Sequence, residues 1–216
     1  MKKLLILILV LILALSFGAC NLLPIGGGTA TTEEDDIEAQ AGEFLSLIAS
    51  KTYHIKYKSI MSGPRVEELD EVIIETEKEE YAKDGMTAIV LIDEKETVRT
   101  VVRDGKVYHI VDKIETMVVR EFSTDEEATS LLAGIGRMAG TAPSGFGTDE
   151  FNGETLNYAE YNDEKGTVRL FMRDSTLVGI HMIGEDYVLD IIILVLDQNI
   201  PDDIFDIPEG YTQIGE

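Results

Sequence analysis

Residues 33–50 place apolar side chains at the spacing of an α-helix. Apolar residues three and four positions apart lie on one side of a helix, so this segment predicts an amphipathic helix whose stripe a sheet would cover. Thr31 and Thr32 before it are good caps, and the acidic residues that follow suit the positive end of the helix dipole. The apolar positions are Ile37, Ala41, Phe44, Leu45 and Ile48.

From residue 51 the hydrophobic period changes to two. In residues 53–61, tyrosine and isoleucine alternate with histidine and lysine, which is the pattern of a strand with one wet face. Asp104-Gly105 is the clearest two-residue hairpin, and such short returns permit only antiparallel neighbours. The predicted strands are residues 53–61, 69–83, 86–92, 97–103, 106–111, 116–122, 155–161, 167–173, 177–183 and 187–197.

A second helix is predicted at residues 125–139, followed by a glycine-rich loop at 141–148. Its apolar positions are Leu131, Leu132, Ile135 and Met138. Gly134 and Gly136 each weaken a helix by up to about 1 kcal/mol relative to alanine. Such a helix predicts a lid that opens by local unfolding, and the alternative is that the glycines allow close packing.

The run at residues 191–196 is apolar at every position. A strand that is apolar on both faces needs cover on both, so one predicted helix is placed against one of its faces.

The chain begins with a basic pair, Lys2 and Lys3, and an apolar run over residues 4–17. That run is shorter than the roughly 20 residues of a membrane-spanning helix and has the size of an export signal. The following Phe17-Gly18-Ala19-Cys20 resembles the lipobox of bacterial lipoproteins, in which the cysteine is lipidated and becomes the first residue. The alternative is an uncleaved apolar anchor. We therefore expect a signal peptide at 1–19, a lipidated Cys20 with a flexible tether to residue 32, and a folded domain at 33–216, held on the extracytoplasmic side of the cell membrane.

The net charge is strongly negative, with 18 basic side chains against 41 acidic ones, and loss of Lys2 and Lys3 would leave −25. A nucleic-acid binder needs clustered lysine and arginine, so this class of partner is excluded. The single cysteine leaves no intramolecular disulfide, so the core alone would hold the domain.

No catalytic or metal-binding motif is present in the sequence. His54, His109 and His181 stand in three separate predicted strands, and none lies within four residues of another histidine or of Cys20. The acidic runs do not match the spacing of a calcium loop. We expect no enzyme activity, no cofactor and no metal site.

The order of anchor, tether, helix, strands, helix and strands resembles the lipoprotein-carrier superfamily, the LolA, LolB and LppX-like proteins. The residues that carry the resemblance are the aromatic strand at 53–57, the hairpin at 104–108, and the closing Phe205-x-Ile207-Pro208-x-Gly210-Tyr211. It implies an α+β fold, an open antiparallel half-barrel of roughly ten strands with two amphipathic helices packed on its concave face. It also implies a space between helices and sheet that accepts a lipid, an acyl chain or another apolar ligand.

A sheet of about ten strands must curl, and two modest helices would not fill its concave side completely. We expect a lipid-anchored ligand-binding module, fixed in place by Cys20. The alternative is a sensor or interaction domain with a filled core and a protein partner, as in the RseB branch. The side chains expected to line the cavity are Phe44, Ile48, Ile55, Tyr57, Leu131, Leu132, Ile135 and Met138.

Overall fold

The computed structural model describes residues 33–62, 74–92, 97–122, 130–163, 166–185 and 187–214, all within the unit Thr32–Glu216. The expected signal peptide, Cys20 and tether lie outside the described residues, and they remain predictions. No helix among the described residues has the length and apolar character that a membrane crossing requires.

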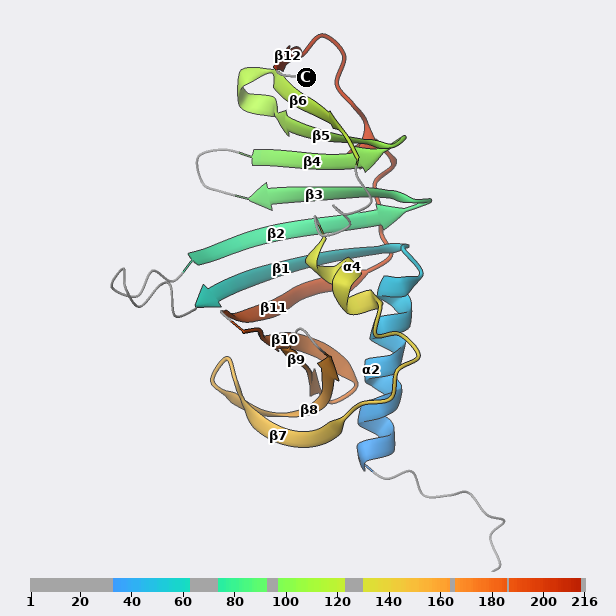
Figure 1. Cartoon of the computed structure of the whole chain (residues 1–216), viewed down its shortest axis with the longest axis vertical. Coiled ribbons are helices and arrows are strands. Elements are labelled where there is room, and N and C mark those ends of the chain that lie inside the picture. Colours follow the sequence, from blue (N-terminus) through green and yellow to red (C-terminus); the bar gives the residue numbers. More distant parts are fainter. Residues whose placement is uncertain are drawn as a thin grey trace, which may run out of the picture. The chain divides into compact units, whose positions relative to one another are not determined.

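Among the described residues, twelve strands form one sheet, in the order β12-β6-β5-β4-β3-β2-β1-β11-β10-β9-β8-β7 (Figure 1). All neighbours are antiparallel except β12 and β6, which run parallel. The sheet curls strongly at its β7–β10 end and is more open over β2–β6 (Figure 1). The strands are β1 Tyr53–Ser62, β2 Ile74–Lys83, β3 Met86–Ile92, β4 Thr97–Arg103, β5 Lys106–Val111, β6 Thr116–Glu121, β7 Gly145–Phe151, β8 Glu154–Asp163, β9 Gly166–Arg173, β10 Thr176–Ile183, β11 Val188–Asp197 and β12 Thr212–Ile214.

The predicted strand pattern is confirmed, and β3, β4 and β5 have the predicted bounds. The expected number of about ten is too low, because β7 and β12 were not predicted. β7 begins within the segment predicted as a glycine-rich loop. Gly147 in β7 reflects close packing, since a Cβ there would lie 2.6 Å from the hydroxyl of Tyr158.

The central strand pair joins distant parts of the chain. β1 lies between β2, its neighbour in sequence, and β11, which enters the sheet about 130 residues later. Strands β7 to β11 follow one another as a meander, and β2 to β6 form a second one. β1 with β11 is therefore the seam between two meanders.

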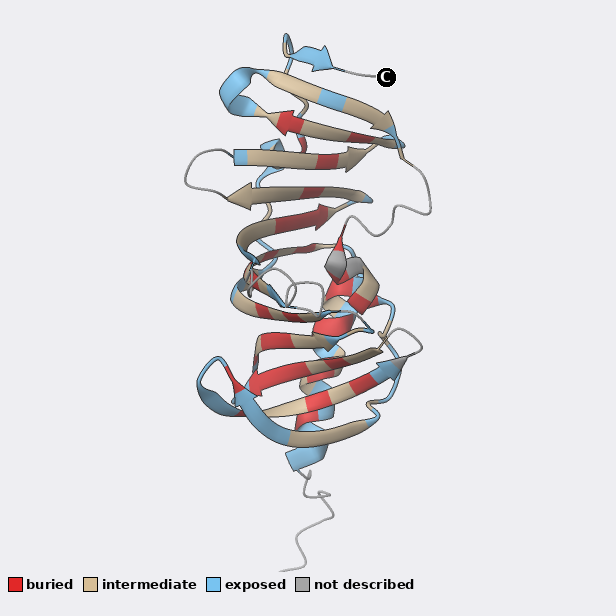
Figure 2. Cartoon of the chain, turned by 60° about the vertical axis from the view of Figure 1, so that its left-hand side comes forward, coloured by how far each residue is buried: buried red, intermediate tan, exposed pale blue. Residues whose placement is uncertain are grey.

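Helices α2 (Glu33–Ala49) and α4 (Leu131–Gly136) lie on one side of the sheet, which we call the inner face. The buried residues of α2 pack with those of α4, β1 and β8–β11 into the main core. Buried positions concentrate in these elements, whereas β3–β6 carry mostly half-buried residues (Figure 2). The helices therefore cover one end of the inner face more fully than the other.

The outer face of β2–β6 has a core of its own. Phe205, in the short 3-10 helix η3 (Asp202–Phe205), is 2% exposed and packs with Tyr81, Val101 and Ile110. Arg99 donates hydrogen bonds to the carbonyls of Ile204 and Asp206 at 2.9 and 3.0 Å. The closing segment thus covers the side of the sheet opposite to the helices.

The second helix is shorter than predicted. α4 spans six residues, and residues 125–129 of the predicted helix lie outside the described residues. After Gly136 the backbone continues in i→i+3 hydrogen bonds, including the amide of Met138 to the carbonyl of Ile135 at 2.9 Å. A Cβ on Gly136 would lie 2.9 Å from Cγ2 of Ile48, so this glycine permits close packing of α4 on α2.

The apolar run at 191–196 is not covered on both faces. Ile191 is fully buried, but Leu194 is 49% exposed and Val195 is 36% exposed. The register between β1 and β11 shifts after Lys56, opposite this part of β11, so the regular alternation is interrupted there. The expectation of two-sided cover is wrong for these two side chains.

Candidate functional site

A cavity of about 380 Å³ lies between α4, the end of α2 and the inner face of β1–β4, and we call it the α4 cavity. Its floor comes from the sheet and its walls from the helices and from two hairpin turns. The lining residues are Ile48, Ala49, Lys51, Tyr53, Ala82, Gly85, Met86, Thr87, Val102, Arg103, Asp104, Gly105, Phe122, Ser130, Gly136 and Arg137.

Cross-strand pairing shows which side chains continue from this cavity over the inner face. Directly paired residues of neighbouring antiparallel strands point to the same side of a sheet. Ile55 pairs with Glu80, and the same row continues through Ile89, Thr100 and His109. The two flanking rows run from Ala82 through Thr87, Val102 and Val107, and from Lys78 through Leu91, Val98 and Val111.

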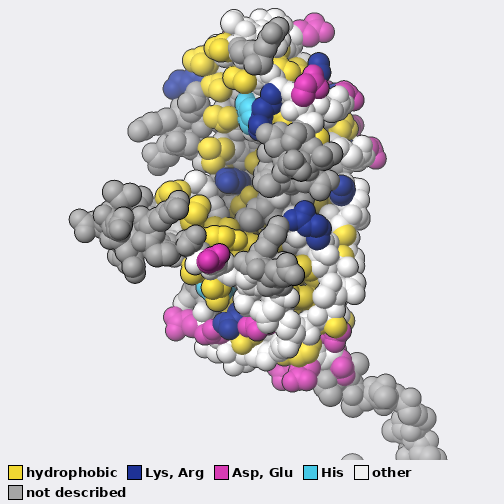
Figure 3. All heavy atoms as spheres, viewed as in Figure 1, with side chains coloured by type: hydrophobic (Ala, Val, Ile, Leu, Met, Phe, Trp, Pro, Cys, Tyr) yellow, Lys and Arg dark blue, Asp and Glu magenta, His cyan; other side chains and the backbone are white. Residues whose placement is uncertain are grey.

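This inner surface of β3–β6 is largely apolar and only partly covered. The side chains of Ile89, Leu91, Val98 and Val102 are half-buried, and Val118 in β6 is 40% exposed. Hydrophobic side chains gather over β3–β6 on the face that carries α4 (Figure 3). The apolar surface therefore extends beyond the part of the sheet that α2 covers.

A buried polar cluster stands beside the α4 cavity. Glu80 in β2 is completely buried, and its Oε1 accepts hydrogen bonds from the hydroxyls of Tyr53 and Ser130, both at 2.5 Å. Its Oε2 has no hydrogen-bond partner among the described residues. Burial raises the pKa of the Glu80 carboxyl above its usual range, although the two hydroxyls act in the opposite direction. Because Ser130 directly precedes α4, the carboxyl connects the sheet to the start of that helix.

A second, smaller cavity of about 290 Å³ lies between the α4 region and the start of β7, and Tyr161 of β8 lines it. Met138 and Arg137 also line this space. Arg137 therefore borders both cavities, one on each side of the segment that follows α4.

The structure brings most of the predicted cavity residues together in the main core. Ile48 lines the α4 cavity, and Met138 lines the smaller one. Leu131 lies in α4, but its side chain is outside the described set. Contact of any of these residues with a ligand stays a prediction. The buried core positions are Phe44, Ile48, Ile55, Tyr57, Leu132 and Ile135.

The three histidines lie on different parts of the sheet. His54 and His181 pair through Nδ1 with Asp197 at 3.0 Å and Asp190 at 2.6 Å, both on the outer face. His109 is on the inner face, with Nδ1 3.0 Å from a threonine hydroxyl of β4. In the described part of the chain, no three His, Cys, Asp or Glu side chains are grouped as metal ligands.

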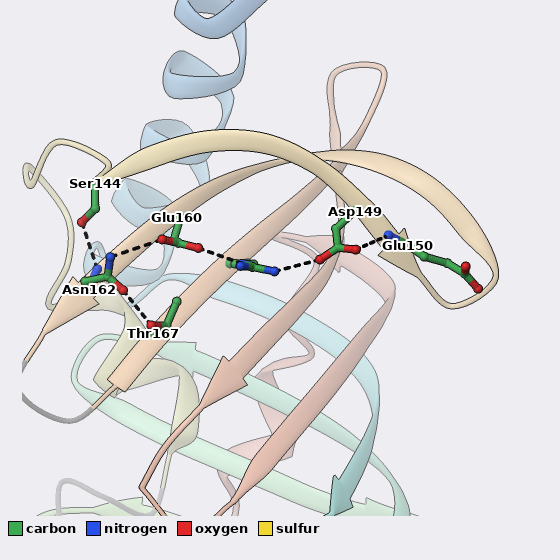
Figure 4. A network of polar contacts seen from close by, with 7 residues as sticks. Ser144, Asp149, Glu150, Glu160, Asn162 and Thr167 are labelled. Atoms are coloured by element: carbon green, nitrogen blue, oxygen red, sulfur yellow. Dashed lines mark hydrogen bonds and ion pairs between the residues drawn. The ribbon is translucent and has the colours of Figure 1, made fainter.

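A polar network occupies the outer face at the curled end of the sheet (Figure 4). Arg169 of β9 bonds to Glu160 and Asp149, both at 2.8 Å, and lies over the ring of Tyr158. Asn162 extends the network to Glu160 and to Ser144. These groups satisfy one another across three strands, so we read the network as structural support for β7 to β9.

No family model matches the chain, and no curated protein matches its sequence. Solved structures are similar to it at low sequence identity. An uncharacterized conserved protein from Thermus thermophilus is 9% identical with a TM-score of 0.44, over 82% of this chain and 98% of that one. LprF from Mycobacterium bovis is 9% identical with a TM-score of 0.43, over 76% and 95%. The lipoprotein LppX from Mycobacterium tuberculosis is 12% identical with a TM-score of 0.41, over 75% and 96%. These similarities of structure, at low sequence identity, include LppX, one of the proteins that the sequence resembles.

Sequence reasoning missed Glu80, which stands beside the α4 cavity, and the lining residues Lys51 and Arg137. Glu80 stands in the run Glu77-Lys78-Glu79-Glu80, which has the composition of a solvated face. Alternation along the strand shows that Glu80 and Tyr81 point to opposite faces of the sheet. Only the pairing of Glu80 with Ile55 shows that Glu80 is the one on the inner face. Lys51 and Arg137 carried no motif, and only the packing of α4 on α2 brings them to one cavity.

Proposed function

We propose that this chain binds a lipid, an acyl chain or another apolar ligand in the α4 cavity and on the adjoining inner face of β3–β6. The protein would act by binding alone, without catalysis. The observation that carries the proposal is that a cavity of about 380 Å³ opens onto an apolar, partly covered sheet surface. Small-molecule sites typically enclose about 300–1,000 Å³, and the α4 cavity falls within that range.

The physical reason is the cost of leaving apolar side chains in contact with water. Burying a methylene group contributes about 0.8 kcal/mol, so even a short acyl segment laid on this surface gains several kcal/mol. The buried side chains of α2 pack closely with those of β1 and β8–β11, and the larger of the two described cavities lies toward the β2–β6 end. A ligand there would complete the cover that α2 gives to the other end.

We also propose that the chain is held by lipid on Cys20 at the extracytoplasmic side of the cell membrane. The lipobox-like Phe17-Gly18-Ala19-Cys20 supports this location. An anchored protein would accept or hold its ligand beside the membrane surface and would not carry it away.

The test is a fluorescence titration of the full chain with a long-chain monoacylglycerol, an acyl probe with an uncharged head group. Val102→Glu places a carboxylate in the cavity floor, where an apolar ligand would strip it of water. We expect at least about tenfold weaker binding, since desolvating an unpaired polar group costs roughly 2–7 kcal/mol and about 1.4 kcal/mol corresponds to a factor of ten.

Val195→Glu is the matched control, because it makes the same exchange on the outer face, where Val195 is 36% exposed. It should leave binding unchanged. Absence of saturable binding by the wild-type chain would refute the proposal, as would equal losses in the two variants. Copurification with a protein, together with an empty cavity, would favour an interaction domain instead.

A further inference from the structure

Among the described residues that line the α4 cavity, positive charges outnumber negative ones, although the chain as a whole is acidic. The formal net charge is −23, with 41 acidic side chains against 18 basic ones. Lys51, Arg103 and Arg137 nevertheless line the cavity, together with a single carboxylate, Asp104. Basic side chains lie across the middle of this face, while most acidic ones lie toward its edges (Figure 3).

Two of these cations are available to a ligand. The guanidinium of Arg103 donates to Asp104 at 3.0 Å and to the carbonyl of Phe205 at 3.2 Å, so its bonds are made on the outer side. Lys51 and Arg137 are exposed, and neither has a carboxylate within 4 Å among the described residues. In so acidic a chain, two such cations at one cavity are a local concentration of positive charge.

The inner face next to them carries a single carboxyl, Glu80, within the described parts of β1–β6. The inner positions there include Lys78, Arg120 and one carboxyl, Glu80. Burial favours the neutral form of Glu80, because its pKa is raised. By contrast, the exposed glutamates of β2, such as Glu75 and Glu77, point to the outer face, where they pair with lysines of β1. The apolar surface and the cations thus share one side of the sheet.

Lys51 also occupies a backbone conformation that disfavours its presence. Its φ is +54° at the end of α2, in the left-handed region that usually holds glycine or asparagine. A residue with a Cβ costs about 1–2 kcal/mol there, so glycine would serve the helix end better. A strained residue next to a cavity points to a use for its side chain.

We infer that the ligand is an amphiphile with an anionic head group, a phosphate or carboxylate, which Lys51 and Arg137 bind at the mouth of the α4 cavity. This inference rests on the proposed function and names the ligand class for the same site. Charges farther than about 8 Å are largely screened at physiological ionic strength, so the two nearby cations outweigh the distant acidic surface. The acyl part of the ligand would lie on the inner face of β3–β6.

The experiment compares two acyl probes of equal chain length, a monoacylglycerol phosphate and the uncharged monoacylglycerol, on the full chain. We expect the anionic probe to bind about tenfold more tightly at physiological ionic strength, where the distant acidic surface is screened, and this advantage to shrink toward 1 M salt, where the Debye length falls to about 3 Å. Lys51→Gln with Arg137→Gln should remove the advantage, so that the variant binds the two probes with equal affinity.

Lys106→Gln with Arg173→Gln is the matched control. It also replaces one lysine and one arginine by glutamine, but at positions that do not line the cavity. It should retain the advantage. Equal affinity for the two probes, or equal losses in both double variants, would overturn the inference while the proposed function stands. Binding of neither probe would overturn both. Inorganic phosphate that competes as well as the anionic probe would show a site for a small anion and would also overturn it.

Lys51→Gly separates a ligand role from a structural one. Glycine relieves the strain at φ +54°, so the variant should unfold at a slightly higher temperature than the wild type. It should nevertheless bind the anionic probe several-fold more weakly. Unchanged binding of that probe would exclude Lys51 from the head-group site.

Discussion

The buried Glu80 predicts an unusual dependence of stability on pH. Its carboxyl faces Tyr53 and Tyr57 from β1, Lys78 from its own strand and Ser130 before α4. Burial raises the pKa in the folded chain, whereas the unfolded chain has the ordinary value of about 4.3. Between those two pKa values the folded state binds more protons than the unfolded state. The free energy of unfolding therefore falls as pH rises above about 5, and it levels off once the folded-state pKa is passed.

Glu80→Gln is the perturbation that isolates this effect. Glutamine keeps an oxygen for the hydroxyls of Tyr53 and Ser130 but carries no titrating proton. Between the unfolded-state and folded-state pKa of Glu80, each pH unit lowers the free energy of unfolding of the wild type by about 1.4 kcal/mol. The variant lacks this loss. The stability of the variant relative to the wild type should therefore rise by up to about 1.4 kcal/mol per pH unit.

Urea unfolding at pH 5, 6, 7 and 8 measures the difference. Carboxyls with lowered pKa values, such as Glu79, Glu160 and Asp197, stabilise the folded state, and this stabilisation is lost as pH falls. That loss occurs below pH 5, outside the measured range. They are also present in both proteins, so they cancel in the comparison. A constant difference between variant and wild type from pH 5 to 8 would refute the assignment of a retained proton to Glu80.

Two further predictions concern the helices and the anchor. Gly134→Ala should stabilise the chain by up to about 1 kcal/mol, because the nearest atom to its new Cβ is the end of the Arg137 side chain at 3.6 Å. Gly136→Ala should destabilise the chain by about 1–3 kcal/mol, because its new Cβ would lie 2.9 Å from Cγ2 of Ile48. Thermal unfolding of both variants measures these effects, and a higher melting temperature for Gly136→Ala than for Gly134→Ala would contradict them. Cys20→Ala should abolish lipidation and leave a larger precursor, and fatty-acid labelling that persists in the variant would rule out the lipobox.

The strands could be predicted because their pattern is local. Alternating side chains give each strand a wet and a dry face, and turn residues mark the reversals. Asp104 and Asn152 adopt positive φ values of 51° and 50°, each followed by glycine, as the two-residue turn requires. The hairpin at 104–105 therefore lies where the sequence places it, and Asn152-Gly153 reverses the chain in the same way between β7 and β8.

The cavity could not be predicted because it depends on register and packing between distant elements. The expected lining residues lie mostly in the filled core, since α2 packs against β8, β9 and β10. A glycine can mark a flexible segment or a position of close packing, and the sequence does not distinguish the two. Gly147 was placed in a loop but lets Tyr158 lie against β7, and Gly136 suggested a lid but lets α4 approach Ile48.

The seam between β1 and β11 has a consequence for how the molecule is made. His54 and Asp197, which meet across it, are 143 residues apart in sequence, and contacts of such separation close slowly. During synthesis, β1 has β2 as a partner early, but its other edge stays open until residues 188–197 have emerged. The covering segment around Phe205 arrives later still. A stop codon before residue 188 would therefore leave β1 and β10 as exposed edges open to aggregation.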